Sequence, residues 1–155
     1  MINHSPPPRP GTYVLILYLP KELSLIVGGL GTFDLEPGYY TYVGSARGPG
    51  GLAARIARHA RKGNPLRWHI DYLRPHTQWR AIWWTESPQR LECKWAQALS
   101  SLPGATKPIP GFGASDCQCV THLLAFSIEP DAMLVARLPG TVHIAAGALG
   151  GDRIP

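Results

Sequence analysis

The chain has 155 residues, a length that suits a single domain with an ordinary buried core. Its three cysteines are too few and too odd in number for a disulfide framework, so we expect a reducing compartment and a cytoplasmic protein. No apolar run approaches the roughly 20 residues of a membrane span, and the proline-rich start lacks the apolar core of a signal peptide. These features argue against any partnership with a membrane.

The positive charge is concentrated in one part of the chain. Residues 37–70 contain six basic residues and no acidic ones, whereas the remainder carries nine basic and ten acidic residues. The formal net charge of +5 therefore belongs to one patch. Such a patch favours an anionic partner such as nucleic acid. The alternative is a helix face that is charged only because it is solvated.

The N-terminal part is predicted to be mostly antiparallel sheet. Residues 1–10 are polar and rich in proline, which predicts a disordered lead-in. The nearly continuous apolar run of residues 11–19 predicts a central strand. Short strands over residues 23–27 and 32–35 flank a glycine-rich turn and predict a hairpin. Aromatic and β-branched residues predict a further strand over residues 39–43.

A glycine-rich loop and a basic helix follow this strand. Residues 44–51 contain several glycines and a proline, so a loop is expected there. Residues 51–62 show a helical period, with Leu52 and Ile56 on one face and Arg55 on another. A glycine-rich loop that leads into a basic helix is suited to holding phosphate.

Two more helices and two more strands are predicted beyond this point. The apolar spacing of residues 66–73 predicts a short helix, and residues 78–85 predict a strand. Ser87-Pro88 supplies an N-cap and a first-turn proline for a helix that runs to about Leu102. Residues 123–128 are predicted to form the last strand.

These elements predict an α/β (α+β) protein with a small, mainly antiparallel sheet and helices packed on it. The folded domain is expected to span residues 11–128. Residues 129–155 are rich in glycine, alanine and proline and have weak periodicity. They form a C-terminal tail to which the sequence assigns no element.

Two tripeptides on the predicted strands are informative, Gly11-Thr12-Tyr13 and Tyr42-Val43-Gly44. Followed by Arg55 on one helix and Glu92 on a later one, they resemble the GIY-YIG nuclease superfamily. The resemblance covers residues 11–128 and implies a GIY-YIG endonuclease-like fold.

Three further stretches narrow the resemblance to a subgroup. They are Trp68–Leu73, Glu92-Cys93 and Gly111–Cys119. In these stretches the chain is similar to a small group of unknown function, found in archaea and bacteria and sometimes fused to a DNA glycosylase.

The chain departs from the superfamily pattern in two ways. Residues 14–41 separate the two tripeptides, a longer gap than is usual. An extra β-hairpin between the two signature strands accounts for this gap, and it can narrow or cover the substrate cleft. Many members also carry a late asparagine that supports the site, whereas this chain has only Asn3 and Asn64. Both departures affect the expected catalytic turnover and leave the expected fold unchanged.

The resemblance implies a metal-dependent endonuclease that hydrolyses phosphodiester bonds in DNA, of a repair or recombination type. Tyr13 and Tyr42 would make a water nucleophilic, provided that a nearby cation favours the phenolate. Arg55 would be that cation and would clamp a phosphate oxygen. His59 would shuttle a proton or orient the water. Glu92 would hold Mg²⁺ (or Mn²⁺), because Mg²⁺ takes only one or two protein carboxylates.

Each of these residues also has a purely structural interpretation. The tyrosines can be sheet residues with hydrogen-bonded tips, and Arg55 a surface arginine. His59 can be an ordinary helix-face histidine, and Glu92 a solvated helix residue. His69 and Asp71 flank the apolar face of the short helix, where they either line the cleft or hydrogen-bond to neighbouring groups.

Substrate binding is expected from the glycine-rich loop and the basic patch. The candidates are Gly44, Ser45, Arg47, Arg58, Lys62 and Arg67.

The cysteines offer a second metal site as one of two alternatives. Cys93, Cys117, Cys119 and His122 offer four soft ligands that suit a tetrahedral Zn²⁺ ion. The alternative is a buried thiol cluster that packs the end of the glutamate helix. Because Cys93 adjoins Glu92, either arrangement would help to hold the carboxylate in place.

Three functions follow from these features. The first is the metal-dependent DNA endonuclease. The second is a catalytically weak or inactive nucleic-acid-binding module that works alongside a DNA-repair protein. The third is a zinc-stabilised adaptor in which the Cys/His cluster only holds the fold.

Overall fold

The computed structural model describes residues 5–61, 63–114 and 119–146. Within them, five strands form one antiparallel sheet in the order β6-β4-β1-β5-β7, and β2 and β3 form a separate two-stranded sheet. The mixed α+β class predicted from the sequence is confirmed. The strands of the main sheet are β1 (Gly11–Leu19), β4 (Gly38–Ala46), β5 (Gln78–Thr85), β6 (Leu123–Phe126) and β7 (His143–Ala146).

β1 is the central strand, as its apolar run predicts. It pairs along its whole length with β4 on one side and along most of it with β5 on the other. Both faces of β1 are covered, which explains why its sequence is apolar rather than alternating. Leu15 and Leu17 point into one core, whereas Val14 and Ile16 point into the other.

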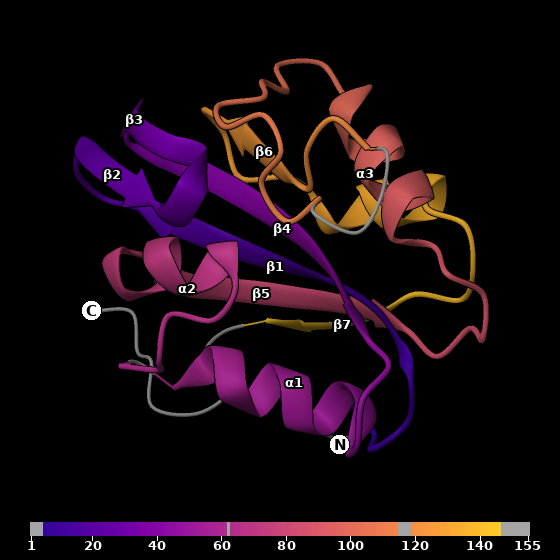
Figure 1. Ribbon diagram of the computed structural model, residues 1–155. Helices are drawn as coiled ribbons and strands as arrows, with labels where there is room; N and C mark the ends of the chain where they lie inside the picture. Colours follow the sequence, from indigo (N-terminus) through magenta and orange to yellow (C-terminus); the bar gives the residue numbers. More distant parts are fainter. Residues whose placement is uncertain (1–4, 62, 115–118, 147–155) are drawn as a thin grey trace.

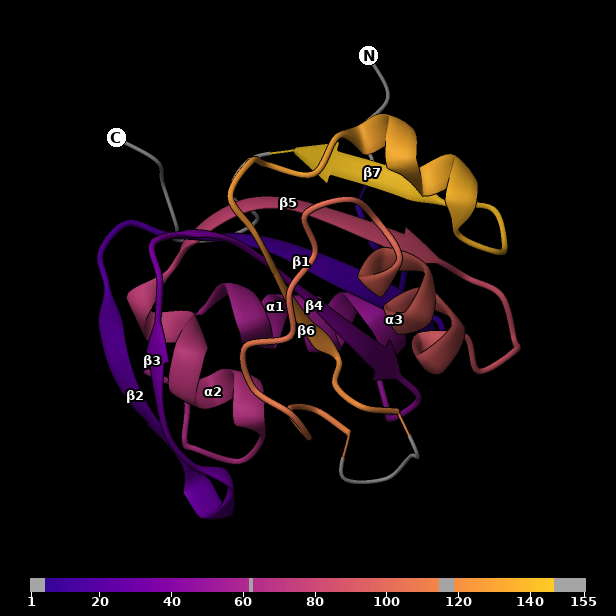
Figure 2. The same cartoon turned by 90° about the horizontal axis from the view of Figure 1, so that it is seen from above.

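The two cores define two layers on opposite faces of the sheet (Figures 1 and 2). The first layer contains α1 (Gly51–Ala60), α2 (His69–Leu73) and the hairpin β2 (Leu23–Val27) and β3 (Gly31–Leu35). The second layer contains α3 (Glu92–Ser100) and the 3-10 helix Ala132–Arg137. The amphipathic period of α1 brings Leu52 and Ile56 into the first core, as predicted.

The described part of the predicted lead-in, residues 5–10, is attached to α1. The first backbone N–H groups of this helix lack intrahelical partners. Leu52 and Ala53 donate instead to the carbonyl oxygens of Arg9 (2.8 Å) and Pro7 (2.9 Å). Arg9 also forms an ion pair with Glu86 at 2.7 Å. The segment therefore closes the N-terminal end of α1.

Several boundaries differ from the sequence prediction. The helix expected from residue 66 begins at His69, and the strand expected to end at residue 128 ends at Phe126. The loop expected from Gly44 begins later, because Ser45 and Ala46 continue the ladder with β1. The helix expected from Ser87-Pro88 begins at Glu92. The Ser87 hydroxyl oxygen accepts a bond from the Gln89 N–H at 3.2 Å, so the serine stabilises a local turn rather than a helix start.

The strand at residues 123–128 is not the last one. β7 pairs with the outer edge of β5, and the 3-10 helix Ala132–Arg137 lies beside it (Figure 2). Weak periodicity concealed this strand, whose pairing depends on an edge formed much earlier in the chain. None of the helices in the described residues combines the length and the apolar character needed to cross a membrane.

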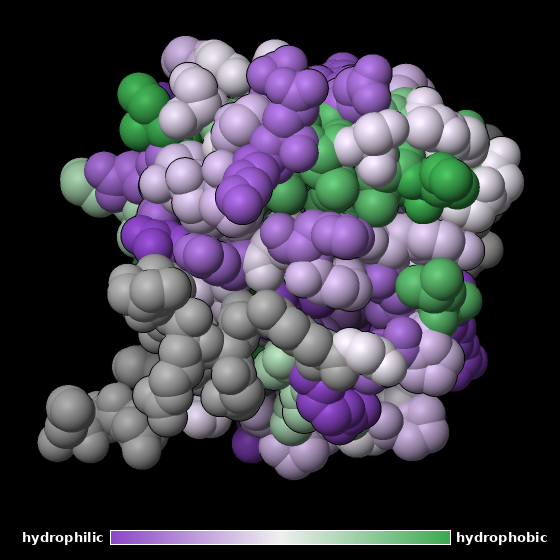
Figure 3. Space-filling view, turned by 90° about the vertical axis from the view of Figure 1, so that its left-hand side faces the viewer, coloured by the Kyte–Doolittle hydropathy of each residue, from purple (hydrophilic) through white to green (hydrophobic). Residues whose placement is uncertain are grey.

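The extra hairpin is formed as predicted, with Leu23 paired to Leu35 and Val27 to Gly31. It packs on α2 rather than joining the main sheet. Within β2, the side chains of Leu25 and Val27 are buried, whereas Ile26 is 65% exposed. Seen from the side of the hairpin, the surface is mixed, and most of its hydrophobic side chains lie in the upper half (Figure 3).

Candidate functional site

The short length of β6 leaves part of β4 without a neighbour. β6 pairs with β4 only from Tyr39 to Tyr42, and one further bond joins the Val43 N–H to the His122 carbonyl at 3.0 Å. Beyond this point no described strand covers that edge of β4. We refer to this uncovered stretch, residues 44–46, as the open edge.

A cavity of about 390 Å³ lies at the open edge. It is lined by Tyr42, Val43, Gly44, Ser45, Arg47, Arg55, Arg67, Trp68, His69, Arg90, Glu92, Gly113 and His122. The wall includes four arginines and one glutamate, so its net charge is strongly positive.

Three of the five predicted catalytic residues line this cavity: Tyr42, Arg55 and Glu92. Tyr42 belongs to the first core and Arg55 to the helix packed on it, whereas Glu92 begins the helix on the opposite face of the sheet. The open edge is what allows a residue from the second layer to reach the same cavity. No described residue of the hairpin lines it, so the expected narrowing of the cleft by the hairpin does not occur.

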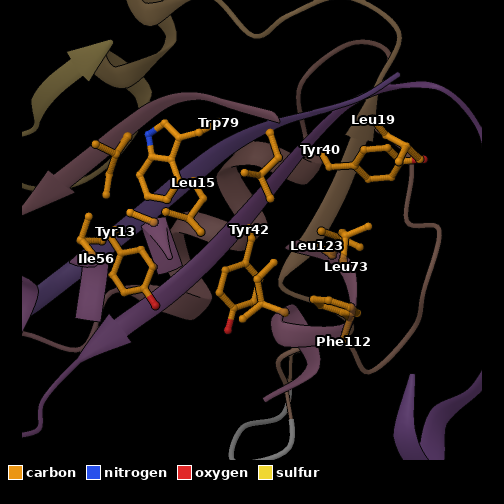
Figure 4. Close-up of a cluster of buried hydrophobic side chains, with 14 of the residues drawn as sticks. Tyr13, Leu15, Leu19, Tyr40, Tyr42, Ile56, Leu73, Trp79, Phe112 and Leu123 are labelled. Atoms are coloured by element: carbon orange, nitrogen blue, oxygen red, sulfur yellow. The ribbon is translucent and has the colours of Figure 1, made fainter. Parts of the chain in front are cut away.

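The other two, Tyr13 and His59, lie behind the cavity wall. Both side chains are 1% exposed, and the Tyr13 hydroxyl lies 2.6 Å from His59 Nε2. Gly44 is the register partner of Tyr13, and a Cβ atom on Gly44 would collide with the tip of the Tyr13 ring. The hydroxyl groups of Tyr13 and Tyr42 point to the same side, away from Trp79 (Figure 4). The absence of a side chain at Gly44 therefore makes room for the buried tyrosine.

Burial controls the protonation of both tyrosines. Desolvation raises the pKa of Tyr42 to about 12 and that of Tyr13 well above its usual value. The Arg55 guanidinium lowers both pKa values but does not outweigh burial. Arg55 alone therefore does not make a phenolate available, and both hydroxyl groups are neutral near pH 7.

His59 is neutral for the same reason. Burial lowers its pKa to about 3, with a further contribution from Arg55. Among the described residues, its Nδ1 atom is buried without a hydrogen-bond partner. The Tyr13–His59 contact is thus a neutral pair that can share one proton in either direction.

Arg55 and Arg58 occupy different environments although they are three residues apart on α1. Arg55 Nη1 donates to the Ser45 carbonyl at 2.8 Å, and its guanidinium lies 4.3 Å from the Trp68 ring centre. Arg58 lies equally close to Trp68, at 4.2 Å, but both its terminal nitrogens bind the Asp71 carboxylate. Arg58 is not among the residues that line the cavity.

Asp71 has a structural role and His69 faces the cavity. The Asp71 carboxylate is 4% exposed and also accepts bonds from the backbone N–H groups of Arg67 and Trp68. Although burial opposes it, the bond from the Arg58 guanidinium and these two backbone bonds lower the pKa of Asp71 below its usual value. His69 Nδ1 accepts from the Gly113 N–H at 2.8 Å, and desolvation lowers its pKa. Neutral His69 therefore carries its proton on Nε2.

The remaining substrate-binding candidates divide into two groups. Gly44, Ser45, Arg47 and Arg67 line the cavity, whereas Lys62 lies outside the described residues. Arg47 Nη2 also donates to the Gln89 carbonyl at 2.7 Å, which ties the end of β4 to the turn before α3. Asn64 donates to carbonyls at the end of α1 and is not among the residues that line the cavity. Asn3 lies outside the described residues.

Two cavity residues, Trp68 and Arg90, had no role assigned from the sequence. Trp68 precedes a short helix and Arg90 lies two residues before Glu92, so periodicity gave no reason to place either in a cavity. Arg90 lies outside the basic stretch of residues 37–70, so the charge pattern gave no signal for it either.

Glu92 has the chemistry of a ligand for a hard cation. Its Oε2 atom is buried and has no hydrogen-bond partner in the described part of the chain. A buried carboxylate oxygen without a partner is costly unless a cation or water binds it. Mg²⁺ and Mn²⁺ prefer such oxygen ligands, and water completes their coordination.

Cys93, Cys119 and His122 come together, as predicted, at the start of α3. Their ligand atoms lie within 4.8 Å of one another, and the group could hold a metal ion. The Cys93 and Cys119 sulfur atoms are paired at disulfide distance. The fourth predicted ligand, Cys117, lies outside the described residues. Burial lowers the pKa of His122, whereas the Glu92 carboxylate raises it.

The comparisons with known proteins identify a family but no characterised relative. Neither the curated proteins nor the solved structures include a match to the chain. A family model described as "Domain of unknown function DUF123" matches residues 12–141, which include every described residue that lines the cavity. The chain therefore belongs to the DUF123 family.

Proposed function

We propose that the protein is a GIY-YIG-type endonuclease that hydrolyses phosphodiester bonds in DNA. One observation carries the proposal: Tyr42, Arg55 and the partly unpaired Glu92 carboxylate line one cavity at the open edge of β4. The two signature tripeptides also lie on the paired strands β1 and β4. A DNA-repair protein is the partner that we expect.

The arginines of the cavity support an anionic substrate. Among the described residues, Arg47, Arg55, Arg67 and Arg90 form no ion pair, although Arg47 and Arg55 donate to backbone carbonyls. Guanidinium groups bind phosphate oxygens through paired N–H donors. Their number would suit the phosphate backbone of a nucleic acid, whose binding energy depends mainly on such contacts.

The residues of the chain would divide the chemistry as follows. Arg55, held by the Ser45 carbonyl, would stabilise the charge that develops on the phosphate during attack by water. Tyr42 would donate a hydrogen bond from its neutral hydroxyl, since its pKa is about 12. The Tyr13–His59 pair behind Gly44 would hold a proton that it can give to, or take from, the hydrogen-bonded groups of the cavity.

The unpaired Glu92 oxygen fits a metal ion. Glu92 would hold Mg²⁺ or Mn²⁺, which would supply positive charge beside the phosphate and the leaving oxygen.

Cleavage of DNA tests the proposal directly. Purified protein should nick plasmid or branched DNA only when Mg²⁺ or Mn²⁺ is present. Glu92→Gln keeps the size of the side chain and removes its charge, so cleavage should fall by at least about 100-fold. The matched control is Glu129→Gln, whose carboxylate pairs with Arg80 elsewhere on the molecule. Equal activity in Glu92→Gln and wild type would refute the assignment of Glu92.

A nucleic-acid-binding module without turnover is the second candidate. It is favoured by the raised pKa values of Tyr13 and Tyr42, which remove the phenolate as a base near pH 7. This candidate predicts salt-sensitive DNA binding. Cleavage would be absent with either metal ion.

A further inference from the structure

We propose that Cys93, Cys119 and His122 form a redox-controlled binding site for a soft divalent cation such as Zn²⁺. In the oxidised state the two sulfurs bind each other and exclude the ion. In the reduced state both thiolates and the imidazole bind it. The site differs from the Glu92 position in its chemistry, and the inference does not depend on the proposed nuclease activity.

The distances between the ligand atoms suit a tetrahedral ion. Zn²⁺ binds cysteine sulfur at about 2.3 Å and histidine nitrogen at about 2.0 Å, so these two ligands lie about 3.5 Å apart in a tetrahedron. The observed separation of Cys93 Sγ and His122 Nε2 is 3.9 Å. Two sulfurs and one nitrogen form a donor set that Zn²⁺ prefers over Mg²⁺.

The histidine is already held in position. The backbone N–H of His122 donates to the Phe112 carbonyl at 2.8 Å, and the backbone carbonyl of His122 accepts from the Val43 N–H at 3.0 Å. The ring also hydrogen-bonds to the backbone of Val43, a contact of the kind that orients metal-binding histidines. Only the cysteine side chains must therefore change when the site converts between its two states.

The two states are linked by a balanced reaction. Cellular thiols reduce the disulfide by delivering two electrons and two protons, and they become a disulfide themselves. The two cysteine thiols then release their protons to solvent as their thiolates bind the cation. Cys93 and Cys119 are both only half-buried, so a reductant can reach them.

The position of the site links it to the cavity. His122 lines the cavity, and Cys93 follows Glu92 in the first turn of α3. Either the disulfide or a bound ion would attach the start of α3 to the segment before β6. Reduction without metal would release this attachment.

The wild-type chain itself provides the first test. Metal-free protein is divided into an oxidised sample and one reduced by a water-soluble phosphine, which takes oxygen from water and delivers the two protons. Zn²⁺ binding is then measured by competition with a chromogenic chelator. We expect one Zn²⁺ per reduced chain, bound at least about 100-fold more tightly than by the oxidised chain. The number of titratable thiols should rise by two on reduction and fall by two on zinc loading.

Two variants identify the ligands. Reduced Cys119→Ser should bind Zn²⁺ at least about 100-fold more weakly than wild type, and His122→Ala at least about 10-fold more weakly. The control is His76→Ala, which removes an exposed histidine from the 3-10 helix Arg74–His76. Circular dichroism checks the fold, and Cys119→Ser remains decisive if buried His122 cannot be replaced.

Two results would overturn the inference: equal zinc affinity of oxidised and reduced wild type, or undiminished affinity in Cys119→Ser. No cleavage assay enters this test, so its failure would be distinct from a failure of the proposed nuclease activity.

Discussion

The cavity has two walls, and different chemistry stabilises each. One wall comes from β4, α1 and α2, where the ion pair between Arg58 and the buried Asp71 supports Trp68 and Arg55. The other comes from the start of α3, where Glu92 adjoins the linked cysteines. In the first wall the supporting charges, those of Arg58 and Asp71, are paired with each other. The second retains an unpaired carboxylate oxygen and a bond that a reductant can break.

The difference shows why only some charged residues are available to a ligand. Arg58 is neutralised by Asp71, whereas in the described structure Arg55 has no carboxylate partner. The first wall can therefore hold a guanidinium at the cavity without changing shape. If both proposals hold, the second wall would respond to metal ions and to redox conditions.

Removal of Asp71 should have the largest effect on the first wall. Asp71→Ala leaves Arg58, whose side chain is 16% exposed, without its partner, and it removes the acceptor of two backbone N–H groups. Breaking such a pair costs about 3–5 kcal/mol in the free energy of unfolding. Urea denaturation measures the loss. The control is Asp34→Ala, an exposed residue of the hairpin, which should change stability by less than about 0.5 kcal/mol.

Reduction should have the next largest effect, on the second wall. The Cys93–Cys119 link closes a loop with a sequence separation of 26 residues. Its loss in metal-free protein should lower the free energy of unfolding by about 3 kcal/mol. Denaturation with and without a reductant gives the value. Cys119→Ser should show no dependence on the reductant, and a dependence as large as that of wild type would contradict the assignment.

Acidification should weaken the first wall through His59. Its pKa is about 3 in the folded protein and lies near 6.5 in the unfolded chain. Between these values the unfolded chain binds a proton that the folded protein does not, so stability falls as the pH falls. The slope attributable to His59 is about 1.4 kcal/mol per pH unit. The free energy of unfolding is measured from pH 6.5 to 5 for wild type and His59→Gln. The difference between their slopes gives the contribution of His59, because the carboxylates titrate in both proteins.

Arg55→Ala should change stability the least and binding the most selectively. It donates one part-buried bond, to the Ser45 carbonyl, so the free energy of unfolding should change by about 1 kcal/mol. The slope of the logarithm of the DNA-binding constant against the logarithm of the salt concentration should become shallower by about 1, because one fewer counterion is released on binding. Arg61→Ala, an exposed arginine at the end of α1, is the matched control. A binding defect in both variants would mean that charge alone, rather than the cavity, determines affinity.

Local sequence features were sufficient to predict most helices and strands of the fold. The apolar run Gly11–Leu19 and the strand Gln78–Thr85 have the predicted bounds, and α1 ends within two residues of its prediction. The start of α3 was misplaced because Ser87 can cap either a helix or a turn. β7 was missed because its four residues become a strand only beside β5.

The candidate site divides in the same way. By itself, the sequence determined which residue types were available: two tyrosines within glycine-containing strand motifs, a run of arginines, the glutamate at position 92 and a cysteine–histidine cluster. Tertiary structure decided that Arg55 reaches the cavity while Arg58 is neutralised, and that Tyr13 is buried behind Gly44. The physical reason is that burial and partner choice depend on contacts between segments far apart in the chain, which local periodicity does not record.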